Sequence, residues 1–163
     1  MGFKAVILTI SDRGSRGERK DTSGPEIAGL LRQTGMEIVG QEIIPDEKEL
    51  IRRALIAWSD GDQTDLILTT GGTGVSPRDV TPDATQEVLD REIPGMAEEM
   101  RRRSVAITPR AMISRAVAGI RGRTLIINLP GSPKGATENL AVVLPALAHT
   151  IEKIKGDDRD CAS

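Results

Sequence analysis

The residues best suited to chemistry lie in a glycine-rich segment, 69–85, with the sequence TTGGTGVSPRDVTPDAT. An apolar run precedes it and predicts a strand buried on both faces. Three glycines in four positions let the backbone turn sharply and approach a ligand closely, because no Cβ stands in the way. Thr81 followed by Pro82 predicts a helix start with Thr81 as the N-cap. This order of elements is typical of a phosphate site, although a merely tight strand-to-helix turn would also use the glycines.

Two aspartates stand where a carboxylate could hold Mg²⁺ against a phosphate chain. Asp79 lies in the glycine-rich segment, and Asp46 follows the expected strand 37–44. Each also has a structural explanation. Asp79 could pair with Arg78 on the surface, and Asp46 has capping-box spacing to Glu49 and could cap the next helix. The residue pattern leaves both alternatives open.

Covalent and zinc chemistry are disfavoured by the scarcity of the side chains they need. The chain has one histidine, His149, expected in the last helix as a structural or exposed residue, and one cysteine, Cys161. These two residues support no catalytic triad, no zinc cluster and no internal disulfide. Phosphoryl-type chemistry works by positioning and charge stabilisation and does not require them.

Composition excludes several classes of partner. The net charge is −2 and aromatic residues make up 1% of the chain, so we expect no nucleic-acid binding by basic surface or base stacking. No apolar run approaches the length of a membrane span. Met1 to Lys4 leads directly into an expected strand rather than into a signal peptide. A cytoplasmic protein without membrane contact is the resulting expectation.

Strands and helices alternate along the chain, which predicts an α/β fold with a mostly parallel, doubly wound sheet. The expected strands span 5–10, 37–44, 65–70 and 124–129, and the expected helices span about 21–33, 45–58, 81–89, 96–103 and 136–155. The pattern over residues 104–123 indicates only short segments that pack against the rest of the fold. Pro145 predicts either a kink in the last helix or the start of a second helical segment. We expect a single domain over 1–155 and a polar tail over 156–163.

The carboxyl ends of such strands form the usual ligand-binding edge of the sheet. Four loops far apart in the sequence fall there, and we expect them to share one rim: 11–17, 45–49, 71–81 and 130–135. The last of them has a sufficient structural account as well, with Ser132 as an N-cap and Pro133 in the first turn of a helix.

The glycine-rich segment, TTGGTG followed by RDVTPDA, resembles the signature of the MogA/MoaB family of molybdenum-cofactor proteins. Other segments match family patterns in the same order: ISDR at 10–13, IPDE at 44–47, PG at 94–95, SRAVAGIRG at 114–122 and NLPGSPK at 128–134. The resemblance covers most of the chain. It is strongest to the molybdopterin adenylyltransferase type, which also forms the G domain of proteins such as gephyrin.

The resemblance implies a three-layer αβα sandwich that assembles as a homotrimer, and a reaction of molybdopterin with ATP and Mg²⁺. The products would be adenylyl-molybdopterin, handed over to a molybdate-inserting enzyme, and pyrophosphate. Asp46 and Asp79 match the acidic positions for catalysis and metal binding. Positions matching contacts to molybdopterin and its phosphate are Thr70, Gly71, Gly72, Thr73, Gly74, Ser76, Arg78 and Ser114. Positions matching the nucleotide pocket are Ser11, Asp12, Arg13, Gly119, Pro130, Gly131 and Ser132.

Three other functions remain as alternatives. Some MoaB-type members lack the Arg-Asp pair after the glycine loop and bind molybdopterin without adenylylating it; here Arg78 and Asp79 are both present, which favours the active type. A non-catalytic scaffold is a second alternative, disfavoured by a short chain without an appended domain. A generic nucleotide-binding enzyme would explain the glycine loop but none of the other motifs.

Overall fold

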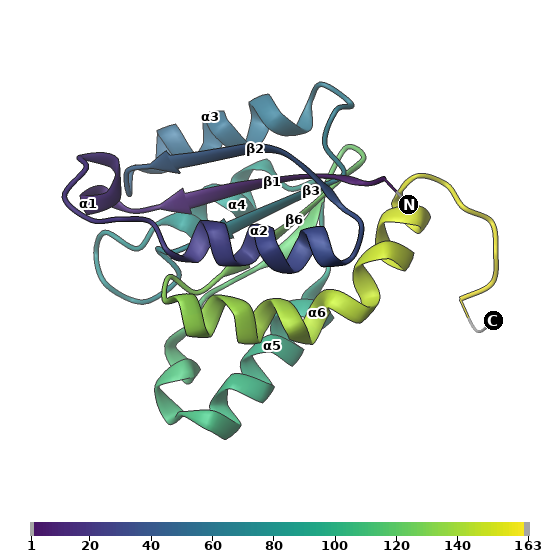
Figure 1. Ribbon diagram of the computed structural model, residues 1–163. Coiled ribbons are helices and arrows are strands. Elements are labelled where there is room, and N and C mark those ends of the chain that lie inside the picture. Colours follow the sequence, from purple (N-terminus) through teal and green to yellow (C-terminus); the bar gives the residue numbers. More distant parts are fainter. Residues whose placement is uncertain (1, 162–163) are drawn as a thin grey trace.

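The computed structural model describes residues 2–161, which form one six-stranded mixed sheet with helices on both faces (Figure 1). The strands are β1 (Lys4–Ile10), β2 (Glu37–Ile44), β3 (Leu66–Thr70), β4 (Arg91–Glu92), β5 (Ala118–Arg121) and β6 (Thr124–Leu129). The α-helices are α1 (Asp12–Ser15), α2 (Ser23–Gln33), α3 (Lys48–Ser59), α4 (Thr81–Val88), α5 (Pro94–Ile107) and α6 (Pro133–Ile154), and a 3₁₀ helix, η1, spans Pro109–Ile113.

The sheet has the strand order β2-β1-β3-β6-β5-β4. Its first four strands are parallel neighbours, whereas β5 and β4 extend it as an antiparallel edge. β1 and β6 are buried along nearly their whole length, as expected for parallel strands covered on both sides. The predicted doubly wound, mostly parallel sheet is confirmed.

Two apolar cores separate the sheet from its helices. Side chains such as Ile7, Leu68 and Ile127 pack against α2, α5 and α6 on one face. Those that alternate with them, such as Leu8 and Ile67, pack against α3 and α4 on the other face. The three-layer αβα sandwich is therefore confirmed.

The segment 94–123 is more regular than its sequence pattern predicts. The helix expected over 96–103 begins earlier, at Pro94, and continues to Ile107. Arg101, in the middle of that helix, donates to the carbonyl oxygens of Ser114 and Ala116. Residues 118–121 form a strand because β6 offers them an edge, a partner that local sequence cannot reveal.

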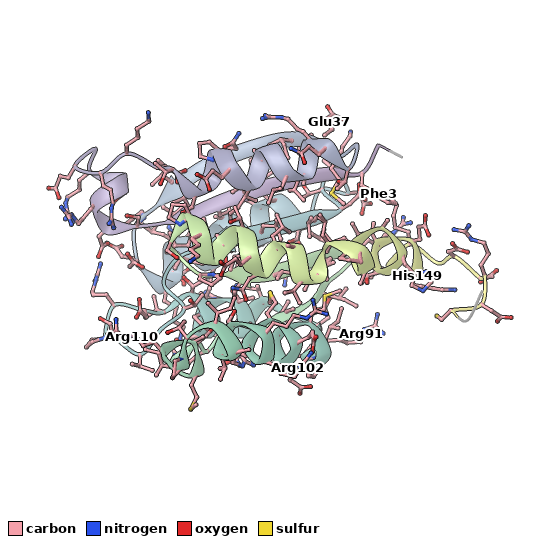
Figure 2. The ribbon with its side chains drawn as sticks, turned by 60° about the horizontal axis from the view of Figure 1, so that its bottom comes forward. Phe3, Glu37, Arg91, Arg102, Arg110 and His149 are labelled. Carbon is pink, nitrogen blue, oxygen red and sulfur yellow. The ribbon has the colours of Figure 1, made fainter. Side chains whose placement is uncertain are left out.

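α6 runs unbroken through Pro145, so no second helical segment begins there. His149 is exposed on this helix, as expected (Figure 2). Arg159, in the tail, donates to the carboxylate of Glu152 on α6 and to that of Asp157. Residues 162–163 of the expected tail lie outside the described range. Among residues 2–161, no helix is both long enough and apolar enough to cross a bilayer.

Candidate active site

A cavity of about 780 Å³ opens beyond the carboxyl ends of the parallel strands, on the side where β1 and β2 end next to α1 (Figure 1). All four loops expected to share a rim contribute to its wall, so that prediction is confirmed. The predicted site residues that line it are Ser11, Asp12, Arg13, Asp46, Thr70, Gly71, Gly72, Ser76, Asp79, Gly131 and Ser132.

Position 71 lies where the segments that follow β1, β3 and β6 meet, and it requires a glycine. Its φ of 105° is a conformation that other residues rarely adopt, and a Cβ there would lie 2.3 Å from the carbonyl oxygen of Ile10. Gly131 packs against it from the other side, since a Cβ on Gly131 would lie 3.2 Å from the Gly71 Cα. The glycines thus make a tight turn, and this turn forms a cavity wall.

Asp46 is held by a reciprocal pair of hydrogen bonds with Asp12. The Asp12 amide donates to Asp46 Oδ2 and the Asp46 amide donates to Asp12 Oδ1, each over 2.9 Å. Parallel pairing sets Ile10 opposite Ile44, which brings the two aspartates together. The predicted capping role of Asp46 was wrong: the N-cap of α3 is Glu47, and its side chain makes no capping bond.

The carboxyl groups of Asp46 and Asp12 differ in the direction of their pKa shifts. Burial raises the pKa of Asp46, and the nearby charges of Asp12 and Asp79 raise it further. Hydrogen bonding from Arg78 lowers the pKa of Asp12. The Arg78 guanidinium donates to both carboxylate oxygens of Asp12, over 2.9 and 3.0 Å. The cavity wall at Asp46 thus favours a bound cation or a proton, because its ionised form is penalised.

Arg78 does not pair with its neighbour Asp79, so that structural alternative was wrong. The Asp79 carboxylate instead accepts the Ser76 amide at 3.0 Å and lies close beneath Gly74, where a Cβ would come within 2.9 Å of Oδ2. Arg78 lines neither cavity described here and contacts the larger one through Asp12.

The predicted cap of α4 was also wrong. Val80 occupies the N-cap position, and Thr81 is the first helical residue. The Thr81 hydroxyl is fully buried and has no hydrogen-bond partner among the described residues. It points at Gly72, where a Cβ would lie 2.4 Å from Thr81 Oγ1 and 3.0 Å from Asp46 Oδ1, so only glycine fits between them.

A second, smaller cavity of about 280 Å³ lies next to the first, between the glycine loop, α5, η1 and α6. The predicted residues Thr73, Gly74, Ser114 and Pro130 line this cavity and not the larger one, and Ser132 lines both. Ser132 caps α6 by accepting the Gly135 amide at 3.0 Å, as its sequence predicts. The expected site is thus divided into two compartments that share one wall.

Gly119, like Arg78, lines neither cavity, and several residues that line the larger cavity were not predicted. Gly119 lies in β5 outside both cavities, where a Cβ would meet the Arg91 carbonyl oxygen at 2.4 Å, and this contact explains the glycine without a nucleotide. Arg19, Lys20 and Thr22 line the larger cavity. They continue the polar loop after β1, and this continuity in the sequence could have identified them as lining residues.

Comparison with known proteins identifies the family. Residues 6–149 match the family described as "Probable molybdopterin binding domain". The chain belongs to this family. Among solved structures, the molybdopterin biosynthesis enzyme MoaB from Thermus thermophilus is 53% identical and superposes with a TM-score of 0.90, over 95% of this chain and 98% of the other. The predicted MogA/MoaB resemblance is thereby confirmed.

Relatives of this family bear two kinds of name. Molybdopterin adenylyltransferase from Helicobacter pylori is 43% identical over 93% of this chain and 87% of its own length. Gephyrin from Dictyostelium discoideum is 46% identical over 89% of this chain, but the chain matches only 21% of gephyrin's length. The similarity to gephyrin therefore concerns one part of a much longer protein.

Proposed function

We propose that this protein is a molybdopterin adenylyltransferase, which transfers AMP from ATP to the terminal phosphate of molybdopterin in molybdenum-cofactor biosynthesis. The observation that carries the proposal is that Asp46 and Asp79, 33 positions apart in sequence, line one cavity together with the glycine loop. Relatives that carry this activity in their names match most of the chain. The family and the acidic, glycine-lined cavity support the same chemistry.

The two compartments suit the two substrates. We place ATP in the larger cavity, against Ser11 to Arg13 and against Gly131 and Ser132 at the start of α6, where the helix N-terminus attracts phosphate. We place the pterin in the smaller cavity, beside Ser114, with its phosphate toward the glycine loop. The shared wall would then bring the phosphate and ATP together.

The residues present fit a Mg²⁺ ion. Carboxylate oxygens are its preferred protein ligands, and Asp46 Oδ1 accepts no hydrogen bond from the described residues although its pKa is raised by burial. Asp46 and Asp79 would hold the ion. Within residues 2–161, no group of three or more His, Cys, Asp or Glu side chains is arranged to hold a metal alone, so phosphate oxygens would complete the shell. Bound there, Mg²⁺ would neutralise phosphate charge.

The chain's own residues position the reactants. A phosphate monoester is mostly ionised at pH 7, so its oxygen can attack the α-phosphorus without a protein base. A bond forms between that oxygen and the α-phosphorus, and the bond from the α-phosphorus to the bridging oxygen breaks. Pyrophosphate leaves with the electron pair. The amides at the N-terminus of α6 would donate to the phosphates in this step.

Pyrophosphate release from ATP, measured with and without molybdopterin, tests the proposal. We expect release only when molybdopterin is present. Asp46→Ala and Asp79→Ala should each lose most of it, whereas Asp158→Ala, which removes an exposed carboxylate of the tail, should keep the wild-type rate. Wild-type rates in both Asp46→Ala and Asp79→Ala would overturn the catalytic assignment. Tight molybdopterin binding without turnover would establish the MoaB-like binding function instead.

We also propose that the chain forms a single domain over 1–155 that assembles as a homotrimer. Apolar side chains exposed near the glycine loop and η1 support self-association: Val75 at 63%, Ile107 at 61%, Met112 at 68% and Ile113 at 54%. Light scattering at micromolar concentration tests this, and a monomeric mass would contradict it. A cytoplasmic location and hand-over of the product to a molybdate-inserting enzyme stay predictions of the same proposal.

A further inference from the structure

Arg115 binds the loop that carries Asp79 at both of its ends. Its amide donates to the Thr73 carbonyl oxygen at 2.8 Å, and its Nε donates to the Gly74 carbonyl oxygen at 2.8 Å. Its Nη2 donates to the Asp79 carbonyl oxygen at 2.6 Å. The same guanidinium pairs with both carboxylate oxygens of Asp83, on α4, over 3.1 and 3.0 Å. One side chain thus joins the beginning of the loop, its end and the helix that follows.

The backbone that carries Arg115 is itself held in place. Arg101, on α5, donates to the carbonyl oxygens of Ser114 and Ala116, the two neighbours of Arg115. Within the loop, the Asp79 amide donates to the Ser76 carbonyl oxygen at 2.9 Å, and the Ser76 amide donates to Asp79 Oδ2. The Asp79 carboxylate is therefore oriented by a turn that ends at Asp79, inside a loop that Arg115 holds at Gly74 and at Asp79.

We propose that Arg115 is a positioning residue for adenylyl transfer, which sets the place of the Asp79 carboxylate in the larger cavity. This inference rests on the function proposed above. Arg115 lines neither cavity, so it acts through Asp79 and not on a substrate. Its planar fork serves two carbonyl oxygens and a carboxylate at once, an arrangement that a lysine ammonium cannot reproduce.

The kinetic test compares Arg115→Ala with Arg115→Lys. Because a displacement of about 1 Å in a positioned group can cost about 100-fold in rate, we expect kcat of Arg115→Ala to fall by about that factor. The KM for ATP should stay within about threefold, because Arg115 contacts none of the residues we place around the nucleotide. Arg115→Lys should recover only part of kcat, since it can keep one or two of the contacts.

Arg121→Ala is the matched control. Like Arg115, Arg121 donates to both oxygens of a carboxylate, here Asp60, and to a backbone carbonyl oxygen, here Val88. Unlike Arg115, it makes no hydrogen bond with the glycine loop in the described part of the chain, and it lines neither cavity. It should therefore keep kcat while losing a comparable exposed ion pair. Asp83→Asn, which removes the anchor of Arg115, should lower kcat, and combining it with Arg115→Ala should lower kcat no further than Arg115→Ala alone.

Hydrogen exchange of the protein without substrates tests the positioning directly and requires no activity. We expect the amides of Ser76 and Asp79 to exchange faster in Arg115→Ala than in the wild type or in Arg121→Ala. Unchanged exchange at these amides, or a wild-type kcat in Arg115→Ala, would overturn the inference. If the wild-type protein itself transfers no AMP, the proposed function fails, and faster exchange at these amides would still support the positioning of Asp79 by Arg115.

Discussion

Gly71→Ala is the sharpest test of how the loops form the cavity. The added Cβ would lie 2.3 Å from the Ile10 carbonyl oxygen, at the end of β1, and a φ of 105° is strained for alanine. Backbone strain of this kind costs about 1–3 kcal/mol. Overpacking against a backbone atom that cannot rotate away costs about another 1–3 kcal/mol. Together they should destabilise the fold by about 2–6 kcal/mol.

Thermal unfolding measures this loss. In a chain of 163 residues each kcal/mol shifts the midpoint by about 2–4 °C, so the Tm of Gly71→Ala should fall by at least about 4 °C. Gly29→Ala is the matched control. Gly29 lies inside α2, where a Cβ would meet nothing within 4 Å, so alanine should raise stability by about 0.5–1 kcal/mol. A Gly71→Ala protein as stable as the wild type would refute the packing argument.

Three further substitutions test individual contacts. Because the folded-state pKa of Asp46 is raised, its ionised form destabilises the fold as pH rises through that pKa. Without Mg²⁺, Asp46→Asn should therefore have a higher Tm than the wild type at pH 7. This difference in Tm should shrink as the pH falls toward 3.8, the ordinary carboxyl pKa. Added Mg²⁺ should raise the Tm of the wild type only. Asn128→Leu should lower the free energy of unfolding, measured by urea denaturation, by about 1–3 kcal/mol, because Asn128 is fully buried and accepts the Val117 amide. An unchanged free energy would show that water takes over this hydrogen bond. Ser132→Ala removes the N-cap of α6 and should lower the free energy of unfolding in urea by about 1 kcal/mol. An unchanged urea midpoint would show that this cap does not stabilise the protein.

Local signals predicted the parts of the site that local backbone geometry determines. The Gly71 turn and the Ser132 cap depend on residues within a few positions, and both were predicted from the sequence. The capping predictions for Asp46 and Thr81 were wrong because each has a competing environment from elsewhere in the fold. Asp46 exchanges hydrogen bonds with Asp12, and the Thr81 hydroxyl is turned toward Gly72. Tertiary packing decides which groups surround a short side chain, and local spacing does not reveal them.

The sequence by itself determined the fold class, the family and the rim of loops that forms the larger cavity. Alternating apolar strands and amphipathic helices must bury their apolar faces together, and parallel strands bring their carboxyl ends to one edge. Only the tertiary structure decided which charges pair across that edge: Arg78 with Asp12, and Arg115 with Asp83. Those partners lie 66 and 32 positions apart, so their meeting depends on strand order and register rather than on neighbouring residues.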